Sequence, residues 1–247
     1  IVIPVASHRL CGVLNCLCFI SKCFIIEYII RPKKLIFNHT GDIFYKKKYL
    51  MIIGLDLSVN STGVCLNRGK DKGYRRHDVS TTRCYEYKII VPKLSKRMKA
   101  INEMKSCSIS HIEYDKIKDL DSHNIRCIAN AICDIIKDMR EKGEEIELVV
   151  IEDVAMAAKG RSIITLTLLN GYVRCMLDQL GLRYETVTPT QWKKEMLGNG
   201  CADKELIVYH WARFDQENCR HMMDMNCKCD DVADAFFLTC WGGGIEK

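Results

Sequence analysis

Two short apolar runs in this chain each end in an acid, and they limit the possible fold more than any other feature. Residues 51–57 read MIIGLDL and residues 147–153 read ELVVIED. Such unbroken apolar runs are typical of strands that are buried on both faces in the middle of a sheet. Apolar residues recur at helical spacing over 122–142 and 162–180, which supplies helices to cover that sheet. The sequence therefore predicts an α/β fold with a mixed central sheet flanked by helices.

The other elements are predicted from shorter patterns. We expect irregular structure over 107–121 and a polar loop over 215–229. Further strands are expected at 63–67, 83–91 and 182–189, and further helices within 93–106, 190–197, 205–214 and 230–241.

Charge is distributed unevenly along the chain. The formal net charge is +6, and residues 1–50 account for all of it, because they hold eight Lys and Arg against two acids. The rest of the chain is neutral, so net charge gives no support for nucleic-acid binding, which would need local basic patches. The 15 cysteines show no regular pairing pattern, which favours reduced thiols in an intracellular protein.

The N-terminal segment is apolar enough over residues 10–30 to suggest a membrane anchor, but Lys22 and Glu27 interrupt it. Each charge would cost about 2.5–3.5 kcal/mol near the centre of a bilayer. No small-residue cleavage site of a signal peptide follows. We therefore expect residues 1–50 to be an extension outside the working domain, which would start at Met51 and span 51–247, with no membrane as a partner.

Four carboxylates from three regions of the chain could form one site. Asp56 and Glu152 end the two apolar strands, and sites in open α/β sheets form beyond the carboxyl ends of neighbouring strands. Asp231 and Asp234 share one face of the last helix, with Asp230 as a rival to Asp231. Carboxylates brought together raise one another's pKa unless a cation neutralises them, and oxygen ligands suit Mg²⁺ or Mn²⁺. Two such ions about 3.5–4 Å apart promote phosphoryl displacement.

Four segments resemble, in the same order, the signatures of RuvC-type Holliday junction resolvases of the RNase H-like superfamily. They are GLDLSVNSTG (54–63), VVIEDVAMAAKGRS (149–162), TPTQWKKEMLGNGCADKE (188–205) and DDVADAFFL (230–238). The first segment alone is weak, because actin-like ATPases use a similar strand and turn, but the combination is specific. The phage and large-virus branch of the family is the most similar. The resemblance implies an RNase H-like fold and a homodimeric endonuclease that nicks opposite strands of a four-way DNA junction with Mg²⁺.

The resemblance also assigns roles to acids. It implies that the family's catalytic, metal-binding carboxylates fall on Asp56, Glu152, Asp231 and Asp234, with two Mg²⁺ ions for which Mn²⁺ can substitute. The enzyme would work inside the cell, at branched DNA, with no small-molecule cofactor.

Basic residues are assigned in the same way. The family's basic pair falls on Lys193 and Lys204, with a Gly-x-Gly turn between them, and Lys204 would also assist catalysis. Lys194 is an equal candidate to Lys193, while Lys159 and Arg161 could grip the DNA backbone beyond the Glu152 strand. Each of these side chains could instead be an ordinary solvated surface group.

The chain departs from the bacterial pattern in two places. About 95 residues separate Asp56 from Glu152, so much of 92–121 is expected to be an insertion, which could be a basic DNA-contacting arm. Ala155 stands where bacterial resolvases often have an aromatic residue, which puts recognition of the junction centre in doubt.

Other features stay open at this point. The helix at 162–180 is the expected dimer interface, and Trp192 and Trp211 are expected in the core or a dimer contact. A zinc site of non-standard spacing could be formed by Cys219, His221, Cys227 and Cys229.

Two alternative functions also stay open. An actin-like ATPase or phosphotransferase would need a second phosphate-binding glycine turn, for which residues 198–200 are a poor candidate. A non-catalytic DNA-binding relative would have no reason to keep four carboxylates that are costly to bring together.

Overall fold

The computed structural model describes residues 35–37, 43–45, 50–68, 85–154 and 161–244. The chain divides into two units, residues 1–48 and 49–247. The described part of the first unit is one antiparallel pair of short strands, β1 (Leu35–Phe37) and β2 (Ile43–Tyr45). The second unit carries the candidate site. Within the described residues, no helix is long and apolar enough to cross a membrane.

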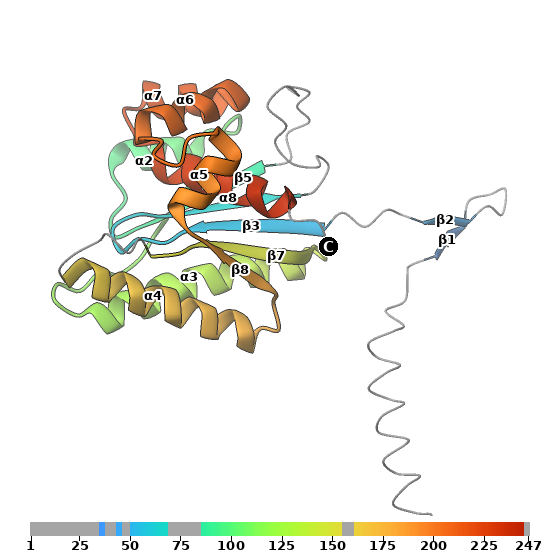
Figure 1. The fold of residues 1–247 in the computed structure, drawn as a ribbon, viewed down its shortest axis with the longest axis horizontal. Coiled ribbons are helices and arrows are strands. Elements are labelled where there is room, and N and C mark those ends of the chain that lie inside the picture. Colours follow the sequence, from blue (N-terminus) through green and yellow to red (C-terminus); the bar gives the residue numbers. More distant parts are fainter. Residues whose placement is uncertain (1–34, 38–42, 46–49, 69–84, 155–160, 245–247) are drawn as a thin grey trace, which may run out of the picture. The chain divides into compact units, whose positions relative to one another are not determined.

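A six-stranded mixed sheet lies at the centre of the second unit, in the order β6-β5-β4-β3-β7-β8 (Figure 1). Only β4 runs against the other five strands. The five strands from β5 to β8 therefore have the order and directions of the RNase H-like fold, which confirms the predicted class. The strands are β3 (Leu50–Asp56), β4 (Thr62–Asn67), β5 (Tyr85–Val91), β6 (Ile109–Glu113), β7 (Glu145–Glu152) and β8 (Tyr184–Val187).

Helices cover both faces of this sheet (Figure 1). One face packs against α3 (Asp121–Glu141) and α4 (Arg161–Gln179), and together they enclose one core. The other face packs against α8 (Asp230–Gly244) and encloses a second core. Around α8 lie α2 (Lys96–Glu103), α5 (Pro189–Leu197), α6 (Lys204–Phe214) and α7 (Gln216–Asp224).

The two covering layers follow from different apolar patterns. Helix α3 buries one stripe, which includes Ile125, Ile128, Ile132 and Met139, and leaves its opposite side polar. Helix α8 buries nearly every residue after its first turn, because it lies between the sheet and the helices α5 and α6. Acids in such a helix can only be placed at its end, and that is where Asp230, Asp231 and Asp234 stand.

Two predictions of irregular structure are wrong. Residues 109–113 form the edge strand β6, which pairs in parallel with β5. The side-chain amide of Asn102 binds the main chain of His111 on the outer edge, accepting from its N–H at 2.7 Å and donating to its carbonyl at 2.9 Å. Residues 216–224, expected in a polar loop, form α7, whose N-terminus is capped by Asp215. Both elements depend on tertiary contacts that a local pattern does not show. Much of the segment 92–121 is thus folded onto the sheet edge as α2 and β6.

Candidate active site

Asp56 and Glu152 end the two adjacent central strands of the sheet. Strands β3 and β7 pair in parallel with Leu55 opposite Ile151, so the next residue of each strand reaches the same edge. Both acidic side chains are half-buried. The structure therefore brings together the two strand carboxylates that the sequence predicted to lie side by side.

Helix α8 approaches the strands closely because two glycines lie beneath it. A Cβ atom at Gly63 would lie 2.1 Å from the main-chain oxygen of Asp231, and one at Gly54 would lie 2.2 Å from that of Ala235. Gly63 is paired with Asp56 across β3 and β4. The first turns of α8 therefore lie directly on the strand ends, and Asp231 and Asp234 are carried to the strand acids.

The four carboxylates are close enough to change one another's pKa. Burial raises the pKa of Asp56 well above its usual value, and the charges of Glu152, Asp234 and Asp231 raise it further. Burial and the charge of Glu152 raise the pKa of Asp234 to about 7. Burial also raises the pKa of Glu152 and of Asp231. A cation bound between such carboxyl groups would favour their ionised form and lower their pKa values.

Three polar side chains hold these acids in place, and the sequence did not predict this role for any of them. The hydroxyl of Ser61 donates to Oδ2 of Asp231. The indole Nε1–H of Trp192 donates to Oε1 of Glu152 at 2.7 Å, and Nδ2 of Asn170 donates to the main-chain oxygen of Glu152 at 3.1 Å. Trp192 lies in the core, as expected, but its polar atom faces the site.

Lys204 pairs directly with Asp230, and its charge also lowers the pKa of each of the four clustered acids. Its ammonium pairs with the Asp230 carboxylate while the rest of its side chain is largely exposed. Burial raises the pKa of Asp230, but the hydrogen bond and charge of Lys204 outweigh it and leave that pKa lowered. Asp231, and not Asp230, is among the groups that raise the pKa of Asp56. The charge of Asp231 thus acts on Asp56, whereas Asp230 is paired with Lys204.

The other basic candidates are placed differently. The charge of Lys193 lowers the pKa of both Glu152 and Asp234, so its ammonium lies near the site, 5.5 Å from the centre of the Trp192 ring. Lys194 is exposed. Lys159 lies outside the described residues, as does the side chain of Arg161, the first residue of α4.

The donor set at this site fits a hard divalent cation. All four side chains offer carboxylate oxygen, which Mg²⁺ prefers. The Oδ1 atom of Asp234 is buried and has no hydrogen-bond partner among the described residues, an arrangement that a bound cation would satisfy. In the part of the chain that the structure describes, no three His, Cys, Asp or Glu side chains already form a metal-binding cluster. That result includes the four carboxylates of this site, which repel one another in the absence of a cation.

The same result bears on the zinc site considered from the sequence. Among the described residues, those four side chains form no metal-binding cluster either. The ring of His221 lies instead 3.3 Å from the hydroxyl of Ser106, and Cys219 and Cys229 are buried thiols.

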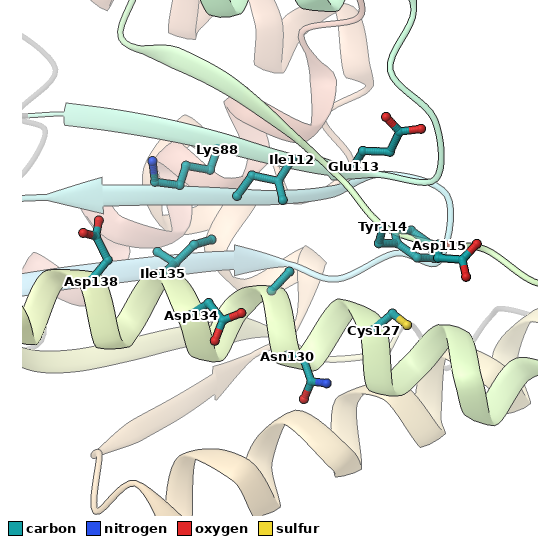
Figure 2. A pocket seen from close by; sticks show the side chains of 11 residues that line it. Lys88, Ile112, Glu113, Tyr114, Asp115, Cys127, Asn130, Asp134, Ile135 and Asp138 are labelled. Carbon is teal, nitrogen blue, oxygen red and sulfur yellow. The ribbon is translucent and has the colours of Figure 1, made fainter.

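A groove of about 470 Å³ lies away from this site, between α3 and the strands β5 and β6 (Figure 2). Figure 2 shows that its lining includes the carboxylates of Glu113, Asp115, Asp134 and Asp138. The one lysine in its lining, Lys88, is paired with Glu86 at 2.8 Å. Such a surface repels phosphate, so this groove is not a candidate for contact with nucleic acid.

A family model described as Lactococcus phage M3 protein, DUF3882, matches residues 94–242, which is more than half of the chain. The chain belongs to this family. The match begins after Asp56 and includes Glu152, Asp231 and Asp234. Membership of a phage family agrees with the phage branch expected from the sequence. Among curated proteins, none matches the sequence.

Several solved structures resemble this member of the phage family at low identity. RuvC of Thermus thermophilus bound to Holliday junction substrate is 12% identical, with a TM-score of 0.48, over 78% of this chain and 91% of that one. RuvC of the same organism in another structure is 12% identical, with a TM-score of 0.45, over 77% and 92%. The fowlpox virus resolvase in complex with Holliday junction DNA is 10% identical, with a TM-score of 0.38, over 78% and 97%.

Proposed function

We propose that this protein is a Mg²⁺-dependent endonuclease that cuts branched DNA. Its substrate would be the four-way Holliday junction, resolved by paired nicks. The observation that carries the proposal is the convergence of Asp56, Glu152, Asp231 and Asp234 at one edge of the sheet, where no described residue donates a hydrogen bond to Oδ1 of Asp234. Four partly buried acids raise the free energy of the folded protein unless a cation joins them.

Each part of the site has a role in this proposal. The four acids would hold two Mg²⁺ ions, which when bound would activate the attacking water and stabilise charge on the phosphate. Lys204, whose charge acts on Asp56 and whose side chain is exposed, would contact a non-bridging phosphate oxygen and stabilise charge in the transition state. The products would be a 5′-phosphate and a 3′-hydroxyl.

Contacts outside the acid cluster would place the DNA. Lys193 and Lys194 on α5, with Lys159 and Arg161 before and at the start of α4, would bind phosphates of the flanking strand. Phosphate contacts fix the position of the duplex but do not read its sequence. The proposed substrate would place the enzyme inside the cell, at DNA.

A second copy of the chain would complete the resolvase. Helix α4 exposes Ile164, Leu168 and Tyr172, at 61%, 56% and 46%, and their spacing of four residues puts them in one apolar stripe. A two-fold dimer through this stripe would set two sites against the two symmetric strands of a junction.

The alternative of an actin-like phosphotransferase would need a phosphate-binding glycine turn, and residues 198–200 were a poor candidate for it from the sequence. Gly198, in the candidate glycine turn, has a φ of 75° and ends α5 as its C-cap. Its N–H donates to the main-chain oxygen of Lys194, which is the ordinary way to terminate a helix. The turn therefore has a structural role that needs no bound phosphate.

The test is cleavage of labelled junction, flap and duplex DNA by the full chain with Mg²⁺. Asp231→Asn should lower the rate by about 100-fold or more, because it removes a charged metal ligand without changing the shape of the side chain. Asp134→Asn makes the same chemical change on the exposed side of α3 and should cut like the parent. If the parent cuts no branched DNA, or Asp231→Asn cuts as well as the parent, the proposal is wrong.

A further inference from the structure

Trp192 is a fully buried residue whose one polar atom points at a proposed metal ligand. Its side chain is 0% exposed, and its Nε1–H donates to Oε1 of Glu152 at 2.7 Å. An indole N–H can only donate, so it can hold a carboxylate oxygen without competing for a cation. The geometry assigns Trp192 the role of a positioning residue that fixes the orientation of the Glu152 carboxylate for metal binding. This inference rests on the proposed function.

The bond leaves the two oxygens of Glu152 in different situations. Oε1 is held by Trp192, whereas Oε2 accepts no hydrogen bond from the described residues. The main-chain oxygen of Glu152 is held separately by Asn170. Glu152 is therefore fixed at its backbone and at one carboxylate oxygen, and the other oxygen is available to a cation. A ligand held at two points keeps its orientation when the cation is absent, which lowers the cost of binding.

The ring of Trp192 is also held by a residue of helix α8. It stacks on Phe237 with ring centres 6.0 Å apart and an angle of 12° between the planes. Phe237 lies three residues after Asp234 on α8. The Trp192 side chain thus contacts β7 through its N–H and α8 through its ring face. It links Glu152 to the helix that carries Asp231 and Asp234.

Trp211 shows what an ordinary core tryptophan does in the same protein. It is equally buried at 0%, and its Nε1–H donates to the hydroxyl of Tyr87 at 3.3 Å. Its polar atom is satisfied inside the core by a neutral partner. Replacing either tryptophan removes a similar volume and one hydrogen bond, but only Trp192 touches the acid cluster. Trp211 is therefore the matched control.

The experiment compares Trp192→Phe and Trp211→Phe in the full chain. Phe keeps an aromatic ring and removes the N–H. Two quantities are measured: the affinity for Mn²⁺ without DNA, and the Mg²⁺ concentration that gives half-maximal junction cleavage. We expect Trp192→Phe to weaken Mn²⁺ binding and to raise the Mg²⁺ requirement by about 10-fold or more, the usual effect of removing a group that orients a metal ligand. Trp211→Phe should leave both quantities at the parental values.

A second measurement on the parent protein avoids any loss of folding in the variant. The chain has three tryptophans, so it gives three indole N–H signals in a ¹⁵N-¹H NMR spectrum. Trp211→Phe and Trp241→Phe identify the signal of Trp192 by elimination. Addition of Mg²⁺ should shift the Trp192 signal and leave that of Trp211 unchanged.

The outcomes separate this inference from the proposed function. Parental metal affinity in a folded Trp192→Phe, an equal loss in Trp211→Phe, or no shift of the Trp192 signal would each overturn the positioning role. The parent could instead bind Mn²⁺, lose affinity on Trp192→Phe, and yet cut no DNA. That result would overturn the proposed nuclease activity and leave the positioning role of Trp192 intact. A parent that binds no Mn²⁺ would overturn both.

Discussion

The main-chain oxygen of Asp231 occupies the space that a side chain at Gly63 would need. A Cβ atom there would lie 2.1 Å from that oxygen, a distance at which backbone must move. Gly63 also pairs with Asp56 across the two strands. Gly63 on β4 therefore lets the first turn of α8, which carries Asp231, lie close beside the end of the strand that carries Asp56.

Gly63→Ala should push the start of α8 away from the strands. A displacement of about 1 Å at a catalytic group can cost about 100-fold in rate, and overpacking costs about 1–3 kcal/mol in the free energy of unfolding. Junction cleavage and thermal unfolding measure the two effects. Gly244→Ala, at the other end of α8, is the control, since its Cβ would meet nothing within 4 Å. A Gly63→Ala protein with parental cleavage would refute this role for the close contact.

Asp230 and Asp231 should respond differently to loss of charge. Asp231→Asn should weaken Mn²⁺ binding by about 10-fold or more, because its carboxylate belongs to the acid cluster. Asp230→Asn should leave Mn²⁺ affinity unchanged, because this carboxylate faces Lys204. Both variants are measured by Mn²⁺ titration without DNA. The reverse order of effects would show that Asp230 is the ligand.

Stability without divalent cations should fall as the pH rises from about 4 to about 7. The pKa of Asp234 is raised in the folded protein to about 7, against about 3.9 for an unfolded chain. A carboxyl with a raised folded pKa stabilises the fold while protonated, and this contribution is lost as pH rises through the folded pKa. The melting temperature in EDTA, compared between the parent and Asp234→Asn, isolates the effect. We expect a steeper fall for the parent and its reversal by Mg²⁺ at pH 7; parallel curves would contradict the assignment.

Leu168→Glu on α4 should separate the proposed dimer into monomers. The charge would lie in the middle of the stripe that also exposes Ile164 and Tyr172. Sedimentation equilibrium should give the mass of one chain for the variant and of two for the parent. Met223→Glu, at the more exposed Met223 on α7, should remain dimeric. A Leu168→Glu protein that is still a dimer would place the interface elsewhere.

The central strands and the strand acids could be predicted because their information is local. An apolar run that ends in an acid shows in seven residues, and α3 shows in the spacing of its isoleucines. Strand β6 could not be predicted in this way, because its short sequence ISHIE is held by pairing with β5 and by Asn102.

The support of the site was hidden for a related reason. Ser61 and Asp231 are 170 positions apart, and Trp192 and Glu152 are 40 apart, so no window of sequence contains either pair. The sequence placed Gly63 only at the start of an expected strand, because the helix that rests on it comes far later in the chain. The acids could be found from the sequence, whereas the residues that orient them could be found only in space.

The central claim is that four distant acids form one site for divalent cations, and Mn²⁺ binding tests it most directly. Electron paramagnetic resonance measures free Mn²⁺ during titration of the full chain, with Mg²⁺ as competitor. We predict two Mn²⁺ ions per chain for the parent, displaced by Mg²⁺, and loss of this binding in Asp56→Asn. A parent that binds no Mn²⁺, or an Asp56→Asn protein that binds as much as the parent, would contradict the account.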